Sequence, residues 1–344
     1  MDLQPTSELL KRHPDLVTGK RLLIAGQLLD YYPLDLAKSA KTTTICITHA
    51  GLSEHYQKQI QPKNSPSVIL NAIPELNGHF DIALLYIPKA KQEADYWINL
   101  LLPHIDKNGE IVIVGENRGG INAAVKLLAK YHLTGHKIDA ARRCSLIYAE
   151  RGNHDILFDE SQWIKNFQVT LVQGELNICS MPGVFNHGKL DQGTDFLLKH
   201  LPPLEGKGLD FGCGAGIIAA ALSLQKKAHM TAVDVSALAT HCTSQTFAAN
   251  QLDGDVICSD GLSAISDTFD FIVSNPPFHL GVNTQYETTR QFIATARQKL
   301  TSQGQLWLVT NSFLPYQSLL EEQFPNCQII ADNRKFRVYC CKPR

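Results

Sequence analysis

The stretch that decides the expected fold is Leu209-Asp210-Phe211-Gly212-Cys213-Gly214-Ala215-Gly216. Its short apolar start is followed by three glycines at alternate positions, and an alanine-rich helix is predicted directly after it, from Ile217 to Gln225. Glycines at these positions let the backbone turn sharply and approach a ligand without a Cβ clash. A strand, a glycine turn and a helix in this order predict a nucleotide-binding α/β domain.

The segments after this turn predict a parallel sheet, because short apolar runs alternate with longer amphipathic stretches. The predicted strands are Gly208 to Phe211, Met230 to Val233, Asp255 to Ser259, Phe269 to Ser274 and Gln305 to Thr310, and the further helices are Ala237 to Asn250 and Thr288 to Leu300.

The first half of the chain has the same plan. Strands are predicted at Leu22 to Ala25, Thr44 to Thr48, Ser67 to Asn71, Ile82 to Ile87 and Ile111 to Val114, with a helix at Gln92 to Leu102. Three local matches, in the same order in each half, indicate an internal duplication. They pair Gly19–Leu22 with Gly206–Leu209 (offset 206 minus 19, or 187), Phe80–Ile82 with Phe269–Phe271 (269 minus 80, or 189), and Asn108–Glu110 with Gln303–Gln305 (304 minus 109, or 195).

We therefore predict an α/β protein of two tandem Rossmann-like domains, residues 1–165 and 166–344. Two unrelated α/β domains are the alternative, since all such sheets share strand and turn signals.

Acidic residues end the next two predicted strands of the second half. Asp234 follows Val233, 24 residues beyond Asp210, where a carboxylate accepts hydrogen bonds from both ribose hydroxyls of a nucleotide. Asp260 ends the third strand, where it could accept a hydrogen bond from an adenine amine. With Asp210 and the glycines Gly212, Gly214 and Gly216, these residues predict a nucleoside-binding site.

The fourth strand of the second half ends in Asn275-Pro276-Pro277-Phe278. Two prolines stiffen the backbone beyond the carboxyl end of the sheet, where ligands bind in such folds. The Asn275 side-chain oxygen and the Pro276 carbonyl can then accept hydrogen bonds from one planar NH2 group, and Phe278 can stack on a base. This arrangement suits methylation of an exocyclic amine.

With these two motifs in register, the second half resembles the class I S-adenosylmethionine-dependent methyltransferases. The segment from Pro182 to Phe185, through Lys189-Leu190-Asp191 to Gly193-Thr194, is similar to the entry of that domain in bacterial ribosomal RNA guanine-N2 methyltransferases. With its degenerate first half, nearly the whole chain is similar to the 16S rRNA guanine-N2 methyltransferases. This resemblance implies S-adenosylmethionine as cofactor, 16S rRNA or the small ribosomal subunit as partner, and the exocyclic N2 amine of a guanine as acceptor. It also places Asn186, His187 and Asp191 near the mouth of the site.

The first half departs from this pattern at every chemical position. Leu23 to Gln27 stands where the second half has Asp210 to Gly214, and Tyr86-Ile87-Pro88 stands where it has Asn275-Pro276-Pro277. We expect this degenerate half to bind no cofactor and to serve as a scaffold or in RNA recognition. Its candidate phosphate contacts are Arg118, Arg142, Arg143 and Arg151.

Composition limits the remaining possibilities. Thirty-two Lys and Arg against thirty-three Asp and Glu disfavour a basic protein that coats nucleic acid. The nine cysteines lack metal-ligand spacing, so we expect reduced thiols, no metal and a cytoplasmic location. No apolar run is long enough to span a membrane. A monomer is compatible with the sequence, which leaves the oligomeric state open.

Other functions stay open at this stage. The same turn also serves methylation of 23S rRNA guanine-N2, adenine-N6 or a protein glutamine. The glycine loop is compatible with an NAD-dependent oxidoreductase, although that class gives no reason for the NPPF turn. A non-catalytic RNA-binding assembly factor is the third possibility, since one half is degenerate.

Overall fold

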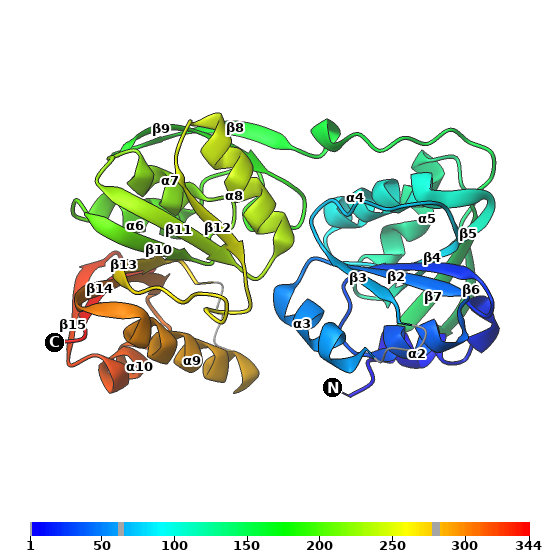
Figure 1. The fold of residues 1–344 in the computed structure, drawn as a ribbon, viewed down its shortest axis with the longest axis horizontal. Helices are drawn as coiled ribbons and strands as arrows, with labels where there is room; N and C mark the ends of the chain where they lie inside the picture. The colour runs from blue at the N-terminus through cyan, green and yellow to red at the C-terminus, as the bar shows by residue number, and fades with distance from the viewer. Residues whose placement is uncertain (1, 61–64, 277–282) are drawn as a thin grey trace. The chain divides into compact units, whose positions relative to one another are not determined.

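The computed structural model describes residues 2–60, 65–276 and 283–344, and it divides into two compact units, Met1–Trp163 and Ile164–Arg344 (Figure 1). This division falls two residues before the boundary expected from the sequence. Trp163 belongs to the first unit because its indole Nε1 donates to Asn99 Oδ1 at 3.0 Å and its ring packs edge-on against Tyr96.

The first unit contains a seven-stranded sheet in the order β3-β2-β1-β4-β5-β7-β6. The first five strands in this order, β3 to β5, are parallel, as predicted, whereas β7 runs antiparallel to both β5 and β6. The strands are β1 (Arg21–Gly26), β2 (Thr42–Ile47), β3 (Ser67–Leu70), β4 (Phe80–Tyr86), β5 (Ile105–Glu116), β6 (His136–Ala141) and β7 (Cys144–Glu150), and the helices are α1 (Pro5–Leu10), α2 (Tyr32–Ser39), α3 (Ala50–Gln59), α4 (Lys91–Leu101) and α5 (Ile121–Lys130).

The second unit repeats this plan with a sheet in the order β12-β11-β10-β13-β14-β16-β15. Its strands are β10 (Gly206–Phe211), β11 (Ala228–Asp234), β12 (Gly254–Cys258), β13 (Phe269–Ser274), β14 (Leu300–Asn311), β15 (Asn326–Asp332) and β16 (Phe336–Lys342), and its helices are α6 (Gln192–His200), α7 (Ile217–Ser223), α8 (Ala237–Ala249), α9 (Asn283–Lys299) and α10 (Tyr316–Gln323).

Strand pairing supports the duplication in detail. Both sheets have the same irregularity between the fourth and fifth strands, after the pair Phe80–Ile105 in the first and Phe269–Leu300 in the second. These pairs are related by the offsets 189 (269 minus 80) and 195 (300 minus 105). The six additional residues therefore lie between β13 and β14, in the segment that carries α9.

The first sequence match is wrong by one residue. Leu22 pairs with Ile82 in the first sheet, and Gly208 pairs with Phe271 in the second. Since Ile82 and Phe271 are equivalent at the offset 189, Leu22 is equivalent to Gly208, an offset of 186 rather than 187. Register is set by backbone hydrogen bonds, which a short match of side chains does not reveal.

A hairpin that the sequence analysis did not predict, β8 (Lys165–Leu171) and β9 (Gly174–Ser180), opens the second unit and packs against α7 and α8. Asn250 fastens it, since its side-chain oxygen accepts from Asn177 N at 2.8 Å and its Nδ2 donates to the Asn177 carbonyl at 2.7 Å.

Helices cover both faces of each sheet (Figure 1). In the first unit, apolar residues of α1, α2 and α3 share one core with β1, β2, β4, β5 and β7, whereas α4 and α5 pack against each other and on the same sheet. In the second unit, α9 and α10 share a core with β10, β13 and β14. Trp97 and Trp307 are buried, as expected of packing residues.

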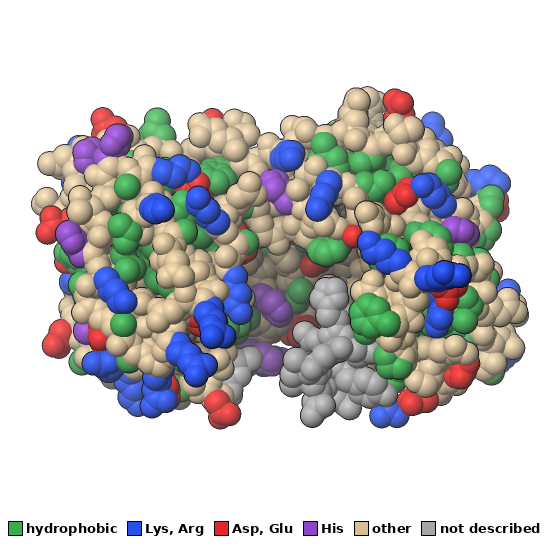
Figure 2. All heavy atoms as spheres, turned by 180° about the vertical axis from the view of Figure 1, so that it is seen from behind, with side chains coloured by type: hydrophobic (Ala, Val, Ile, Leu, Met, Phe, Trp, Pro, Cys, Tyr) green, Lys and Arg blue, Asp and Glu red, His purple; other side chains and the backbone are tan. Residues whose placement is uncertain are grey.

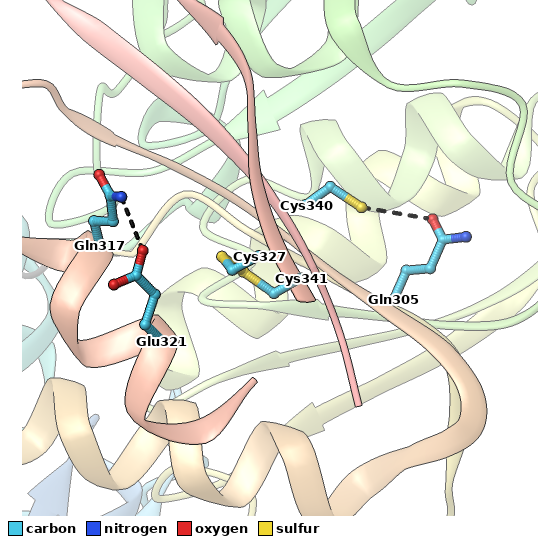
Figure 3. Close-up of a disulfide and its surroundings, with 6 residues drawn as sticks. All are labelled: Gln305, Gln317, Glu321, Cys327, Cys340 and Cys341. Carbon is cyan, nitrogen blue, oxygen red and sulfur yellow. Dashed lines mark hydrogen bonds between the residues drawn. A yellow bond between two sulfur atoms is a disulfide. The ribbon is translucent and has the colours of Figure 1, made fainter. Parts of the chain in front are cut away.

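Two of the nine cysteines form a disulfide, so the expectation of nine reduced thiols is wrong for this pair. Cys327 and Cys341 lie directly opposite each other on the antiparallel strands β15 and β16, with their Cα atoms 4.0 Å apart (Figure 3). The neighbouring Cys340 stays free and contacts Gln305 Oε1 through its Sγ. Among the described residues, no helix is both long and apolar enough to cross a membrane.

Candidate active site

The four polar residues predicted from strand ends lie at one edge of the second sheet. Asp210 is in β10, Asp234 ends β11, Asp260 lies two residues beyond β12, and Asn275 directly follows β13. These strands are neighbours in the order β12-β11-β10-β13 and run parallel. Their carboxyl ends therefore meet at the edge where ligands bind in α/β sheets.

Asp210 has an incompletely satisfied buried carboxylate. Its side chain is fully buried, and its Oδ2 accepts from Ala219 N at 3.0 Å. Its Oδ1 has no hydrogen-bond partner within the described part of the chain. Burial, with a smaller contribution from the charge of Asp234, raises the pKa of Asp210 to about 7. A cationic donor reaching Oδ1 would satisfy this oxygen and stabilise the ionised carboxylate.

The glycine loop needs its glycines for two reasons. Gly212, Gly214 and Gly216 all have φ in the left-handed region, at 74°, 56° and 78°. A side chain would be strained at each of them. At Gly216 a Cβ would also lie 2.8 Å from the Thr243 methyl group, whereas at Gly214 a Cβ would meet nothing within 4 Å. The loop thus packs closely against α8 at one glycine and is open at another.

Two threonines of helix α8 donate hydrogen bonds to carbonyls of the glycine loop. Thr243 Oγ1 donates to the Gly214 carbonyl at 3.1 Å, and Thr246 Oγ1 donates to the Ala215 carbonyl at 2.9 Å. Thr246 Oγ1 also accepts from Cys179 N of the hairpin strand β9. Cys213 of the loop is buried, and burial raises its pKa well above that of an ordinary thiol. A thiol that stays protonated is a poor nucleophile, so Cys213 is a small residue of the loop with no role in covalent catalysis.

Asp234 and Asp260 differ in their surroundings. Asp234 Oδ2 accepts from Gly214 N at 3.0 Å and its Oδ1 accepts from Ser236 N at 2.9 Å, so this carboxylate is fixed against the glycine loop. Asp260 is exposed, and it follows Ser259, whose N–H donates to the Asp234 carbonyl. Each carboxylate oxygen has two lone pairs, so Asp234 can still accept from a ligand.

The side-chain amide of Asn275 is held by both of its N–H groups. Nδ2 donates to Asp191 Oδ2 at 2.8 Å and to Thr194 Oγ1 at 2.9 Å. The same Asp191 oxygen accepts from Thr194 N, which makes Asp191 the N-cap of α6. Asp191 Oδ1 accepts from Asn186 Nδ2 at 2.7 Å. A flipped amide would place its oxygen against the Asp191 carboxylate, so Oδ1 of Asn275 is the atom left to accept a further donor.

Space around this network is limited at Gly193. A Cβ there would lie 2.9 Å from Asp191 Oδ2, 3.3 Å from the Phe336 ring and 3.5 Å from Asn275 Nδ2. Asp191 and Asn186 were expected near the mouth of the site from the resemblance alone, and their hydrogen-bonded link to Asn275 was not predicted. The local sequence gives one indication of the role of Asp191: it lies three residues before Thr194, which is the spacing at which an N-cap side chain accepts from a backbone N–H of the first helical turn.

Pro276 is partly buried beside Asn275, whereas Pro277 and Phe278 lie outside the described residues. His187, also expected near the mouth, contacts Ser180 Oγ through its Nδ1 at 3.0 Å, and burial lowers its pKa.

The first unit has apolar and aromatic side chains at the equivalent positions. With the corrected offset, Ile24 rather than Leu23 is equivalent to Asp210, and Tyr86 is equivalent to Asn275. Both side chains are buried. The Tyr86 hydroxyl contacts Ser7 Oγ at 3.2 Å, and Ser7 Oγ donates to Asp30 Oδ1 at 2.9 Å. Helix α1, which carries Ser7, packs against β5 and β7 as α6 packs against β14 and β16.

The candidate phosphate contacts of the first unit fall into two groups. Arg118, Arg142 and Arg143 are exposed. The prediction that Arg151 contacts phosphate is wrong, because this residue is 5% exposed and donates to three backbone carbonyls. Its Nε reaches Leu102 O at 2.7 Å and its Nη1 reaches His154 O at 2.7 Å and Gly152 O at 3.2 Å.

Among the described residues, no group of three or more His, Cys, Asp or Glu side chains could hold a metal ion.

Comparison with known proteins agrees with this fold. Residues 175–340 match the family model described as "Methyltransferase small domain", and residues 7–167 match its N-terminal companion. A solved T. thermophilus 16S rRNA N2 methyltransferase has the same fold, with a TM-score of 0.84 over 99% of this chain and 92% of that one, at 22% identity. The two sheets and the two family models thus define a protein of two methyltransferase-type domains, of which the second has the acidic strand ends.

Curated relatives give the family more closely. The chain is 40% identical over 340 residues to the ribosomal RNA small subunit methyltransferase C of Aliivibrio fischeri, covering 98% of this chain and 99% of that protein. It is 39% identical to the protein of the same name from Vibrio cholerae, covering 98% of each. The chain belongs to the ribosomal RNA small subunit methyltransferase C family.

Proposed function

We propose that this protein transfers a methyl group from S-adenosylmethionine to the exocyclic N2 amine of a guanine in 16S rRNA, in the assembled small ribosomal subunit in the cytoplasm. The observation that carries this proposal is the Asn275 side chain, whose NH2 group is held by Asp191 and Thr194. Its oxygen is thereby presented as an acceptor for an amine. The name of the relatives, ribosomal RNA small subunit methyltransferase C, and the T. thermophilus structure, solved in complex with AdoMet and guanosine, support the same chemistry.

The residues at the strand ends fit the cofactor. S-Adenosylmethionine supplies an electrophilic methyl group on a sulfonium. The unsatisfied buried Oδ1 of Asp210 suits the ammonium of its methionine part, directly or through a water. Asp234 would hold the ribose hydroxyls and Asp260 the adenine amine. The open side of Gly214, with Gly212 and Gly216, leaves the backbone accessible to the methionine part.

The acceptor side depends on the asparagine–proline turn. A guanine amine has a delocalised lone pair and is a poor nucleophile. Asn275 Oδ1 and the Pro276 carbonyl would each accept one N–H of that amine, while Phe278 stacks on a base extruded from its helix. Holding both N–H bonds favours a nitrogen whose lone pair points at the methyl carbon.

The transfer is a direct displacement. The N2 lone pair forms the new N–C bond while the C–S bond breaks and its electron pair goes to sulfur. The excess proton then leaves N2 for water, so no covalent enzyme intermediate is needed. Orientation of the two reactants accounts for most of the acceleration in this scheme.

The first domain would perform no transfer. Ile24 replaces the cofactor-binding carboxylate and Tyr86 replaces the amine-holding asparagine, and both are buried in its core. We infer that residues 1–165 act as a scaffold or in RNA recognition, and that residues 166–344 carry the catalysis.

A labelled-methyl assay tests the proposal. Purified protein and radiolabelled S-adenosylmethionine would be incubated separately with naked 16S rRNA, small ribosomal subunits, 23S rRNA and ribosomal proteins. We expect label on small subunits, released by nuclease digestion as N2-methylguanosine. Label on a glutamine side chain or on adenine, with none on guanine, would contradict the proposal. Calorimetric binding of NAD and not of S-adenosylmethionine would contradict the cofactor assignment.

A further inference from the structure

The hairpin turn between β6 and β7 presents two arginines where the fold favours other residues. Ala141 pairs with Cys144, so Arg142 and Arg143 form the whole turn. Their φ values are 50° and 62°. Two positive φ values in a two-residue hairpin are the pattern of a type I′ turn, for which Asn-Gly is the preferred sequence. An Arg-Arg turn is therefore a poor choice for folding alone, and it indicates a function for the side chains.

A third arginine belongs to the same surface. Arg118 lies in the loop after β5, beside Asn117, whose N–H donates to the Arg143 carbonyl at 2.7 Å. Asn117 Oδ1 also accepts from Ser145 Oγ at 2.6 Å. The loop and the hairpin are thus fastened together at the edge of the first sheet, and all three arginines are exposed. We call Arg118, Arg142 and Arg143 the arginine edge.

The arginine edge carries an excess of positive charge. Glu8 pairs with Arg142 at 2.7 Å and Glu116 pairs with Lys89 at 3.8 Å. In the described parts of the chain, Arg118 and Arg143 have no ion-pair partner. Figure 2 shows a face on which Lys and Arg side chains gather at the lower left, so positive charge is concentrated on part of the protein surface. The chain as a whole has a net charge of -1, so this concentration is local.

The second domain has the same arrangement at the equivalent turn. Ser312 N donates to the Lys335 carbonyl at 3.0 Å, as Asn117 N donates to that of Arg143. Arg334 and Lys335 are therefore equivalent to Arg142 and Arg143, and Arg334 also has a positive φ, at 69°. The two domains differ at the positions equivalent to Asp210 and Asn275, yet both have a basic pair on this turn.

We propose that the arginine edge binds the phosphodiester backbone of the substrate RNA. Guanidinium groups form bidentate hydrogen bonds with phosphate oxygens, and their planar fork is pre-organised for this geometry. The surface would position the RNA without reading its sequence, since phosphate contacts carry no base information. This inference rests on the proposed function, because it assumes that RNA is the substrate.

The turn itself offers a clean test. The double variant Arg142→Asn/Arg143→Gly removes two charges and installs the sequence that a type I′ turn prefers, so the hairpin is expected to fold at least as well. The control, Lys58→Gln/Lys126→Gln, removes two exposed charges from helices α3 and α5 of the same domain. Binding to purified small ribosomal subunits would be measured from 50 to 200 mM salt, with thermal unfolding in parallel.

We expect the turn variant to bind subunits at least tenfold more weakly at the lowest salt. The slope of log affinity against log salt should be smaller by about 1.5, which corresponds to two lost phosphate contacts. The maximal methylation rate at saturating subunits and the affinity for S-adenosylmethionine should stay within twofold. Unchanged affinity and slope in the turn variant, or an equal loss in the control, would overturn the proposal. Failure of the proposed function would instead appear as wild-type protein that binds subunits without methylating RNA.

Discussion

Asn275 and Asp191 are joined by a hydrogen bond of 2.8 Å across 84 positions of the sequence. Asp191 lies at the start of α6 and Asn275 at the end of β13, so the bond connects the entry of the catalytic domain with its acceptor turn. The carboxylate can only accept, and it therefore determines which end of the amide faces it. Oδ1 of Asn275 is therefore oriented before any substrate binds, and in the proposed mechanism it is the atom that accepts from the incoming amine.

Replacing Asn275 should abolish methylation while leaving the cofactor site intact. We expect Asn275→Ala to lower kcat at least a thousandfold and to keep the affinity for S-adenosylmethionine within threefold, measured by single-turnover assay and calorimetry. Tyr86→Phe at the equivalent position of the first domain is the matched control. It removes the contact with Ser7 and should cost about 1 kcal/mol of stability with no effect on kcat. Turnover above one per cent in Asn275→Ala would contradict the assigned role.

Replacing Asp191 should impair orientation more than folding. In Asp191→Ser the hydroxyl can still cap α6 through Thr194 N, but Asn275 loses its carboxylate partner. We expect kcat to fall about 10- to 100-fold, with KM for S-adenosylmethionine unchanged. Thr194→Val should also lower kcat, and Thr194→Ser should restore it because the hydroxyl acceptor returns. Equal kcat values for the Val and Ser variants would show that Thr194 does not orient the amide.

The buried Asp210 should make the catalytic domain less stable as pH rises. Its pKa is about 7 in the folded protein, against 3.8 for an ordinary aspartate. The folded state thus binds more protons between these values, and the free energy of unfolding falls with rising pH across this window. Across the whole window the free energy of unfolding falls by about 4 kcal/mol.

The variant Asp210→Asn should remove most of this pH dependence and weaken S-adenosylmethionine binding at least tenfold. Thermal unfolding would be measured without cofactor at pH 5 and pH 8. The transition of the catalytic domain is identified beforehand as the one whose midpoint rises when S-adenosylmethionine is added to the wild type. The wild-type midpoint should drop more between these two pH values than the midpoint of the variant. An equal drop of the unfolding midpoint in the wild type and in Asp210→Asn would show that the buried Asp210 carboxyl does not cause the pH dependence.

Arg151 should behave as a structural residue. Its guanidinium donates to carbonyls of Leu102, Gly152 and His154, and Arg151→Met leaves all three carbonyls without this donor. We expect a loss of about 3 kcal/mol in the stability of the first domain, measured by urea denaturation. The salt slope of subunit binding should stay at the wild-type value at temperatures where the variant is folded. A smaller slope would instead place Arg151 on the RNA surface.

Much of the fold could be predicted from the sequence because central parallel strands are short apolar runs. The ten predicted strands correspond to β1–β5 and β10–β14. The antiparallel pairs β6–β7 and β15–β16 and the hairpin β8–β9 were not predicted. Several of these strands are largely exposed and polar, so they lack the apolar signal that identified the others.

The site was predictable only where its residues lie at or near the carboxyl ends of strands. Asp210, Asp234, Asp260 and Asn275 lie at the expected edge, because parallel strands bring their carboxyl ends together. The partner of Asn275 could not be predicted, since a contact between residues far apart in the chain leaves no periodic pattern. The pairing of Cys327 with Cys341 was missed because it depends on the register of two strands that were not recognised as neighbours.

The central claim is that Asn275 presents guanine N2 for methylation in 16S rRNA. The most direct measurement is mass spectrometry of 16S rRNA nucleosides from cells that lack this protein, and from the same cells supplied with wild-type or Asn275→Ala protein. We predict that one N2-methylguanosine is missing without the protein, returns with the wild type and stays absent with Asn275→Ala. An unchanged N2-methylguanosine content without the protein, or its full return with Asn275→Ala, would contradict the account.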